Sequence, residues 1–139
     1  NEFCAAMGLC NLRHVDAEIK KRGMAAARYI ERLGNIKGVR VWQKQDGVTP
    51  NYAYFPVFFD KEIFGKSRDE VSALLAEQNV FARKYFYPIT SEFAAYCGRF
   101  PIQKTPVAKK LSESVLTLPM YAGLEIGDVD RICDIILGK

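Results

Sequence analysis

Residues 80–96, VFARKYFYPITSEFAAY, contain the side chains of this sequence that are best suited to bind a polar ligand. Residues 80–87 are rich in aromatic and β-branched types, contain no glycine and are followed by Pro88, a pattern that predicts a β-strand. Because side chains alternate between the two faces of a strand, one face is expected to carry Phe81, Arg83, Tyr85 and Tyr87.

A guanidinium next to phenols supplies directed hydrogen bonds, which suit a phosphate group or a sugar. The hydroxyls of Thr90 and Ser91, just after the proline, would extend such a site. The same pattern is compatible with an amphipathic edge strand in which Arg83 and Lys84 are simply solvated. From these residues alone, both interpretations stay open.

Composition bounds the kind of protein this is. With 139 residues, 49% of them hydrophobic and 26% charged, the chain fits one globular domain with a real core. The net charge of +4 is spread among 16 acidic residues, so no basic block indicates a nucleic-acid or membrane surface. No apolar run reaches the roughly 20 residues that a membrane-spanning helix needs.

The four cysteines predict structural rather than metal-binding roles. They form no C-x-x-C pair, and the single histidine, His14, offers little help as a further ligand, so we expect no metal site. Cys4, Cys10 and Cys133 lie among apolar neighbours and are expected to be small core residues in a reducing compartment.

Hydrophobic periodicity and capping signals predict an α+β fold. We expect a helix over residues 1–33, strands at 39–42 and 51–60, a helix opened by a capping box at Ser67, a helix from Thr105-Pro106, a strand at 115–118 and a helix at 127–137. Gly34 is expected to end the first helix in a left-handed conformation. Its buried stripe is predicted to be Val15, Ile19, Gly23, Ala26, Ile30 and Leu33.

Two features of that prediction concern packing. A proline at position 56 predicts that the 51–60 strand lies at a sheet edge or carries a bulge, because proline cannot donate to a ladder. Residues 3–12 are apolar on several sides, so they need more partner surface than one sheet provides. The overall expectation is a small, mainly antiparallel sheet covered by helices on one face.

Taken together, four segments resemble the C-terminal domain of the DegT/StrS family of pyridoxal-phosphate-dependent nucleotide-sugar aminotransferases. NEFCAAMGLCNLRHVD resembles the family helix that passes from the large cofactor domain into the small one, and RGMAAARYIERL matches the positions that follow. FARKYFYPIT resembles the family segment Ala-Arg-x-x-aromatic-x-Pro-Leu-His, and VLTLPMYAGLEIGDVDRICDII resembles its closing run. The resemblance covers essentially the whole chain.

This resemblance implies that residues 1–139 form the single small C-terminal domain of a fold-type I aminotransferase, with residues 1–14 leading from a large domain. It implies a cytoplasmic homodimer that uses pyridoxal 5′-phosphate (PLP) to aminate a nucleotide-linked keto-deoxy sugar for polysaccharide or glycan biosynthesis. The amino donor would be glutamate, with no nucleic-acid or membrane partner. The family lysine that forms the internal aldimine has no counterpart here, so none of Lys20, Lys21, Lys66 or Lys84 is expected to act and the 139 residues alone are expected to be inactive.

The resemblance also implies which residues face the substrate. Arg83, Tyr85, Tyr87 and Thr90 fall on the family segment that reaches towards the sugar or nucleotide, and Asn51 and Tyr54 lie on a strand that would line the same cleft. Many family members have His where this chain has Thr90, so Tyr87 or Ser91 would have to replace its contact. The alternative interpretation is a non-catalytic α+β ligand-binding or dimerisation module.

Overall fold

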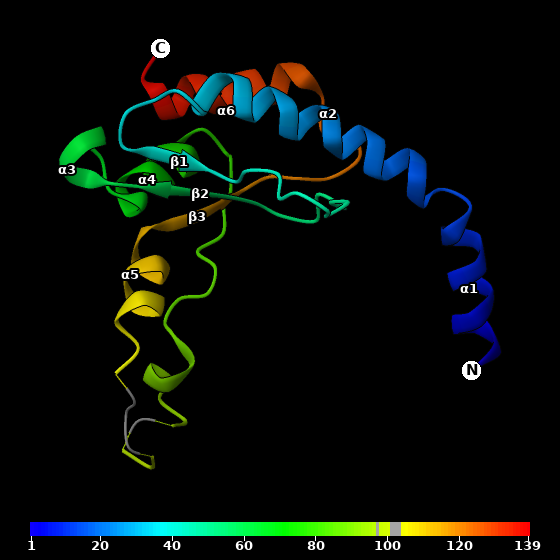
Figure 1. Cartoon of the computed structure of the whole chain (residues 1–139), viewed down its shortest axis with the longest axis horizontal. Coiled ribbons are helices and arrows are strands. Elements are labelled where there is room, and N and C mark those ends of the chain that lie inside the picture. The colour runs from blue at the N-terminus through cyan, green and yellow to red at the C-terminus, as the bar shows by residue number, and fades with distance from the viewer. Residues whose placement is uncertain (97, 101–103) are drawn as a thin grey trace.

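The computed structural model describes residues 1–96, 98–100 and 104–139 (Figure 1). Its elements follow in the order α1 (Glu2–Leu12), α2 (Val15–Leu33), β1 (Val39–Val41), β2 (Phe55–Phe59), α3 (Lys61–Phe64), α4 (Arg68–Glu77), the 3-10 turn η1 (Thr90–Glu92), α5 (Pro106–Ser114), β3 (Val115–Leu118) and α6 (Ile126–Leu137). The α+β prediction is therefore confirmed.

The sheet has three strands in the order β1-β2-β3, and both pairings are antiparallel. The predicted edge position of the proline-containing strand is wrong, because β2 is the central strand. Pro56 is tolerated there because its register partner is Thr117 in β3, whereas the pairing with β1 stops one residue away at Val57. Residues 51–54 lie outside the strand.

One face of the sheet carries the hydrophobic core. Along β2 the residues Phe55, Val57 and Phe59 are buried, while Pro56 and Phe58 point to the other face and are half-buried. Helices α2, α4 and α6 cover the buried face, and their apolar side chains form a single cluster with those of the strands. Figure 1 shows α2 and α6 lying side by side over the strands. The prediction that helices cover one face is confirmed.

The sequence predicts the buried side of α6 better than that of α2. The inner face of α6 is as predicted: Val129, Ile132, Cys133 and Ile136 are buried. In α2 the buried residues are Ala25, Ala26, Tyr29 and Leu33, and the half-buried Ile30 packs against the core. The expected stripe is therefore confirmed at Ala26, Ile30 and Leu33, whereas Val15 is exposed. Tyr29 accounts for the shift, because its ring stacks on Phe55 with centroids 4.8 Å apart.

The predicted first helix is two helices. Helix α1 ends at Leu12 and α2 begins at Val15, and Figure 1 shows α1 turned away from the sheet. Its N-cap is Asn1, whose side-chain oxygen accepts a hydrogen bond from the Cys4 amide at 3.0 Å. No residue of α1 is buried. The prediction that Cys4 and Cys10 are core residues is therefore wrong, whereas Cys133 is buried as expected.

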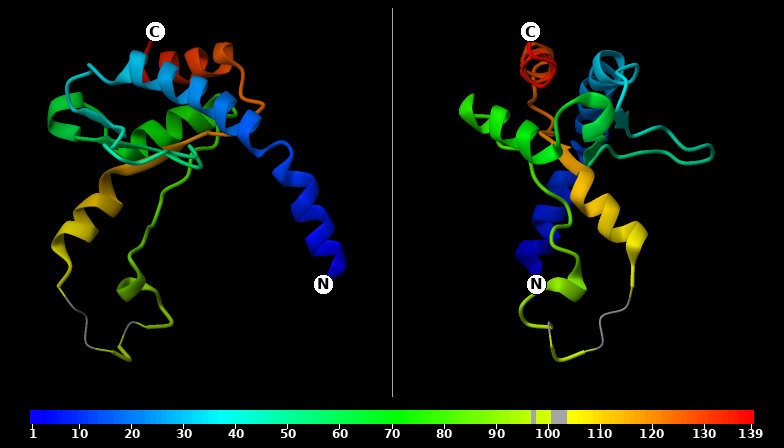
Figure 2. Two further views of the ribbon diagram at one scale, coloured as in Figure 1. Left: turned by 45° about the vertical axis from the view of Figure 1, so that its right-hand side comes forward. Right: turned by 90° about the vertical axis from the view of Figure 1, so that its left-hand side faces the viewer.

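Some of the other local predictions are confirmed and others are wrong. The capping box at Ser67 and the start of α5 at Pro106 are confirmed. Gly34 is right-handed, with φ −65°, so the predicted left-handed cap is wrong. The predicted strand at 80–87 is wrong as well, because only Arg83 pairs with the sheet, through a bridge to Thr117. Beyond that bridge the chain leaves the sheet, and Figure 2 shows it running beside α5 on the side away from α2 and α6.

Candidate functional site

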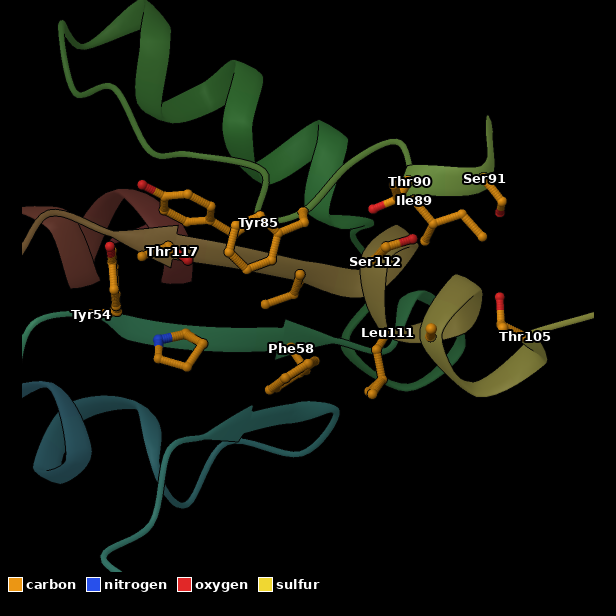
Figure 3. Close-up of a pocket in the computed structure, with 14 residues that line it drawn as sticks. Tyr54, Phe58, Tyr85, Ile89, Thr90, Ser91, Thr105, Leu111, Ser112 and Thr117 are labelled. Atoms are coloured by element: carbon orange, nitrogen blue, oxygen red, sulfur yellow. The ribbon is translucent and has the colours of Figure 1, made fainter. Parts of the chain in front are cut away.

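The open face of the sheet forms the floor of a pocket of about 730 Å³. One wall is the segment after Arg83, the other is α5, and the strands β2 and β3 lie between them (Figure 3). The lining residues are Tyr54, Pro56, Phe58, Tyr85, Phe86, Ile89, Thr90, Ser91, Thr105, Ala108, Leu111, Ser112, Val115 and Thr117.

Strand alternation explains why this floor is apolar. Because Phe55, Val57 and Phe59 point into the core, Pro56 and Phe58 must face the pocket. Figure 3 shows Leu111 of α5 pointing towards Phe58, which closes one end of the floor. Some of the other lining residues carry hydroxyl groups, among them Thr90 and Ser91. The pocket therefore suits a ligand with a flat or apolar part and several hydrogen-bonding groups.

A smaller pocket of about 290 Å³ adjoins the first and shares Tyr54, Tyr85 and Thr117 with it. Arg83 lines this second pocket. Its backbone is held by the bridge to β3, with the Arg83 amide 3.0 Å from the Thr117 carbonyl and the Thr117 amide 2.8 Å from the Arg83 carbonyl. The arginine is thus fixed at its backbone while its side chain stays exposed.

The guanidinium of Arg83 forms a cluster with two tyrosine side chains at the boundary of the two pockets. Its Nη1 donates a hydrogen bond to the Tyr85 hydroxyl at 3.3 Å. The Tyr85 ring meets Tyr54 edge to face, with centroids 5.3 Å apart. The hydrogen bond to Tyr85 raises the pKa of Arg83 above its ordinary value, so the guanidinium is a permanent cation.

The structure brings most of the predicted site residues together. Arg83, Tyr85 and Tyr54 meet at the boundary of the two pockets, and Thr90 lines the larger one with Ser91. Tyr87 does not share their face as predicted, because its ring lies over the guanidinium of Arg68, 4.4 Å from the ring centroid.

Asn51 lies outside both pocket linings. Its side-chain oxygen accepts from the Ala53 amide at 3.0 Å, and its carbonyl accepts from Nε of Arg22 at 3.1 Å. Both bonds shape the loop that leads into β2.

The residues of the two pockets do not fit PLP as a resident cofactor. PLP enzymes need a lysine for the Schiff base and an acidic partner for the ring nitrogen, and neither lining includes a lysine, aspartate or glutamate. Two of the lysines considered above are engaged elsewhere: Lys66 donates to the Ile136 carbonyl at 3.2 Å and Lys84 pairs with Asp69 at 2.5 Å. Lys20 and Lys21 lie exposed on α2.

Sequence reasoning missed the pocket floor and its support. The strand predictions at 51–60 and 115–118 include Phe58 and Thr117 but do not single them out, although the alternation FPVFF marks Phe58 as facing away from the core. Arg68 follows the capping residue Ser67, and no sequence signal marks it as buried. Within the described ranges, no three His, Cys, Asp or Glu side chains gather as a metal site would require, and no helix is long and apolar enough to span a membrane.

Comparisons with known proteins agree with this architecture. The family model of the DegT/DnrJ/EryC1/StrS aminotransferases matches residues 1–137. The dTDP-4-amino-4,6-dideoxy-D-glucose transaminase of Escherichia coli is 34% identical over 141 residues, which cover 100% of this chain and 38% of that protein. The GDP-perosamine synthase of Vibrio cholerae is 28% identical over 138 residues, 96% of this chain and 36% of that protein.

Among solved structures, DesI, determined in the presence of its TDP-sugar product, superposes with a TM-score of 0.88 at 31% identity. The match covers 96% of this chain and 34% of DesI. The chain thus spans little more than a third of the length of these relatives. It belongs to the DegT/DnrJ/EryC1/StrS aminotransferase family.

Proposed function

We propose that this chain is the C-terminal part of a PLP-dependent aminotransferase that aminates a nucleotide-linked keto-deoxy sugar. In this proposal residues 1–139 are one small domain, and residues 1–14 lead into it from a large cofactor-binding domain. The proposal rests on family membership and on the share of its relatives that the chain spans. The domain supplies part of the substrate cleft, and the lysine that PLP requires lies elsewhere in the protein.

The structural observation that carries the proposal is the position of Arg83 in the smaller pocket, beside the larger one. A nucleotide sugar combines a diphosphate, which needs a cation, with a sugar and a flat base, which need hydroxyl partners and apolar surface. Arg83 supplies the cation, the hydroxyls of Tyr85 and Tyr54 supply hydrogen bonds, and the aromatic floor supplies the surface. Among the described residues no carboxylate forms an ion pair with Arg83, so its charge is not already neutralised.

The relatives support a nucleotide sugar over other anions. The names of two of them refer to dTDP- and GDP-linked amino sugars, and DesI was solved with a TDP-sugar. Arg83, Tyr85, Tyr54 and Thr90 are proposed to contact the substrate directly. Asn51 and Tyr87, which lie outside both pockets, are proposed to act only through the segments they hold.

The first test is activity. The longer protein, with PLP and L-glutamate, is expected to aminate a dTDP-linked 4-keto-6-deoxy sugar and release 2-oxoglutarate, measured with a coupled dehydrogenase. A GDP-linked 4-keto sugar run in parallel tests which nucleotide is preferred. The 139 residues alone are expected to give no turnover above buffer. Absence of 2-oxoglutarate from the longer protein with both sugars would refute the proposal.

The second test concerns Arg83. Substituting it with alanine removes a charge-assisted contact made in both the ground and the transition state, so KM for the nucleotide sugar should rise about tenfold while kcat changes little. Arg131→Ala, at an exposed position on α6, is the matched control and should leave KM unchanged. An unchanged KM in Arg83→Ala would mean that this guanidinium is simply solvated.

The same proposal includes a homodimer working in the cytoplasm on precursors for polysaccharide or glycan synthesis. Helix α1 supports an interface, because Phe3, Met7, Leu9 and Leu12 are all more than 60% exposed. That exposure also favours the second candidate, a non-catalytic dimerisation module. Sedimentation of the chain at high concentration tests association, and a monomer would count against both. A lysine preceding a glycine-rich run upstream in the gene would decide for the enzyme.

A further inference from the structure

A buried cation lies directly behind the larger pocket. Arg68, the first residue of α4, is 2% exposed and is the largest of the fully buried side chains among the described residues. Burying a guanidinium is costly unless its donors are hydrogen-bonded. Its contacts therefore indicate what the fold gains by burying it.

On one side Arg68 holds the junction of α5 and β3. Its Nη1 donates to the Ser112 carbonyl at 2.6 Å and lies 3.4 Å from the Val115 carbonyl. Ser112 belongs to the last turn of α5, where helix carbonyls lack partners within the helix and carry partial negative charge. A cation is well suited to this place. Ser112 and Val115 both line the larger pocket.

On the other side Arg68 and its neighbour hold the opposite wall. The Tyr87 ring lies 4.4 Å from the Arg68 guanidinium, within range for a cation–π contact. Arg68 Nε also donates to Asp69 at 2.9 Å, and Asp69 pairs with Lys84 at 2.5 Å. Lys84 and Tyr87 are thus both anchored to the start of α4. The two residues between them, Tyr85 and Phe86, line the pocket.

We propose that Arg68 is the positioning residue of this site, because one buried guanidinium holds both walls of the pocket. Its contact with the Tyr87 ring fixes the segment that carries Tyr85. Its bonds to the Ser112 and Val115 carbonyls fix the α5–β3 junction. It thereby sets Tyr85 and Arg83 against Thr117. Its role in substrate binding rests on the proposed function, whereas the coupling of the two walls belongs to this chain itself.

Lysine cannot replace arginine in this role. A lysine ammonium has the charge but lacks the planar fork that donates in two directions while its face stacks on a ring. Arg68→Lys is therefore expected to loosen the pocket walls. Because a substitution at so buried a site can unfold the protein, the decisive variants are at Tyr87, which is half exposed.

The experiment compares Tyr87→Leu with Tyr87→Phe in the longer protein. Leucine removes the cation–π contact and phenylalanine retains it. Native-state hydrogen exchange of the Arg83 and Thr117 amides, which form the bridge to β3, should be about fivefold faster in Tyr87→Leu and unchanged in Tyr87→Phe. KM for the nucleotide sugar should rise about fivefold in the first variant only, with kcat changed less. Tyr121→Leu, at an exposed tyrosine before α6, controls for general effects.

Unchanged exchange in Tyr87→Leu would overturn the proposal, because the wall that carries Tyr85 would then be held without the contact between Arg68 and Tyr87. Equal effects of leucine and phenylalanine would overturn it too, because the hydroxyl rather than the ring would be responsible. If exchange rises but KM of an active enzyme does not, the role in substrate binding is overturned. If the protein transfers no amino group to any sugar, the proposed function fails. The exchange measurement still decides whether Arg68 holds both walls of the pocket.

Discussion

Arg28 and Asp130 face each other across the interface of α2 and α6, although 102 residues separate them in the chain. Arg28 Nε lies 2.7 Å from Asp130 Oδ1, and Arg28 Nη2 lies 3.0 Å from Oδ2, which is a two-pronged pairing. Arg32 adds a third bond to the same carboxylate at 2.6 Å. The carboxylate therefore joins the first and last helices that cover the sheet.

Asp130→Asn should lower the thermal midpoint of unfolding, because both arginines lose their ionic partner. The loss should shrink in high salt, since the pair is only partly buried and salt screens it. Thermal melts followed by circular dichroism at low and high salt measure both effects. Asp46→Asn, in the exposed turn between β1 and β2, is the matched control. Equal midpoints for Asp130→Asn and the unsubstituted protein would show that the pairing contributes nothing net.

Acid should weaken the start of α4 through Glu70. Hydrogen bonds from Ser67 lower the pKa of this carboxyl from its ordinary value of 4.5 to about 2. Because the folded pKa lies below the ordinary value, the stabilisation is complete above pH 4.5 and is lost as the pH falls towards 2. Glu70→Gln should therefore flatten the pH dependence of the unfolding free energy in that window, measured by urea titration. Glu77→Gln, at the exposed end of α4, should leave the slope as it is.

Gly38 should tolerate alanine less well than Gly47. Both have positive φ, +78° and +73°, which costs an L-residue roughly 1–2 kcal/mol. A Cβ on Gly38 would also lie 2.5 Å from the Phe64 amide nitrogen, whereas a Cβ on Gly47 would meet no atom within 4 Å. Gly38→Ala should thus lose about 1–3 kcal/mol more than Gly47→Ala in denaturant unfolding. Equal losses of stability would mean that the backbone at Phe64 can shift away from the added Cβ at little cost.

The cysteines should react in two classes. Burial raises the pKa of the Cys133 thiol to about 12, so its reactive thiolate is scarce at neutral pH. Cys4 and Cys10 are exposed on α1. In a Cys97→Ser background, iodoacetamide should label Cys4 and Cys10 of the 139-residue chain rapidly. It should label Cys133 only after denaturation. Peptide mass spectrometry measures the labelling at each cysteine. Rapid labelling of native Cys133 would contradict the packing of α6.

How far the sequence predicts this fold depends on the range over which each signal acts. The capping box at Ser67, the proline start of α5 and the apolar stripe of α6 are decided within a few residues, and all three are confirmed. The residue types at Arg13 and His14 do not mark the end of α1. The buried side of α2 depends on Tyr29, whose hydroxyl finds the Pro119 carbonyl at 3.2 Å, a partner 90 residues away.

The site shows the same division. Arg83 and Tyr85 could be selected from their chemistry, but the strand expected to hold them does not form. Tyr54 was named only through the family resemblance, and it lies just before β2. After Arg83 the chain is drawn off the sheet, because Lys84 binds Asp69 and Tyr87 stacks on Arg68. Those partners lie on α4, and a strand-like run of residues gives no sign of them.

Tyr85→Phe should separate the orientation of Arg83 from its charge. The substitution removes the oxygen that accepts from Arg83 Nη1 but retains the ring that packs against Tyr54 and lines both pockets. Under the proposed function KM for the nucleotide sugar should rise about two- to fivefold, less than in Arg83→Ala, because the cation persists with one directing hydrogen bond fewer. Tyr121→Phe is the matched control. A rise as large as that of Arg83→Ala would mean that the Tyr85 hydroxyl contributes as much to substrate binding as the Arg83 charge. No rise would mean that this hydroxyl neither binds the substrate nor orients Arg83.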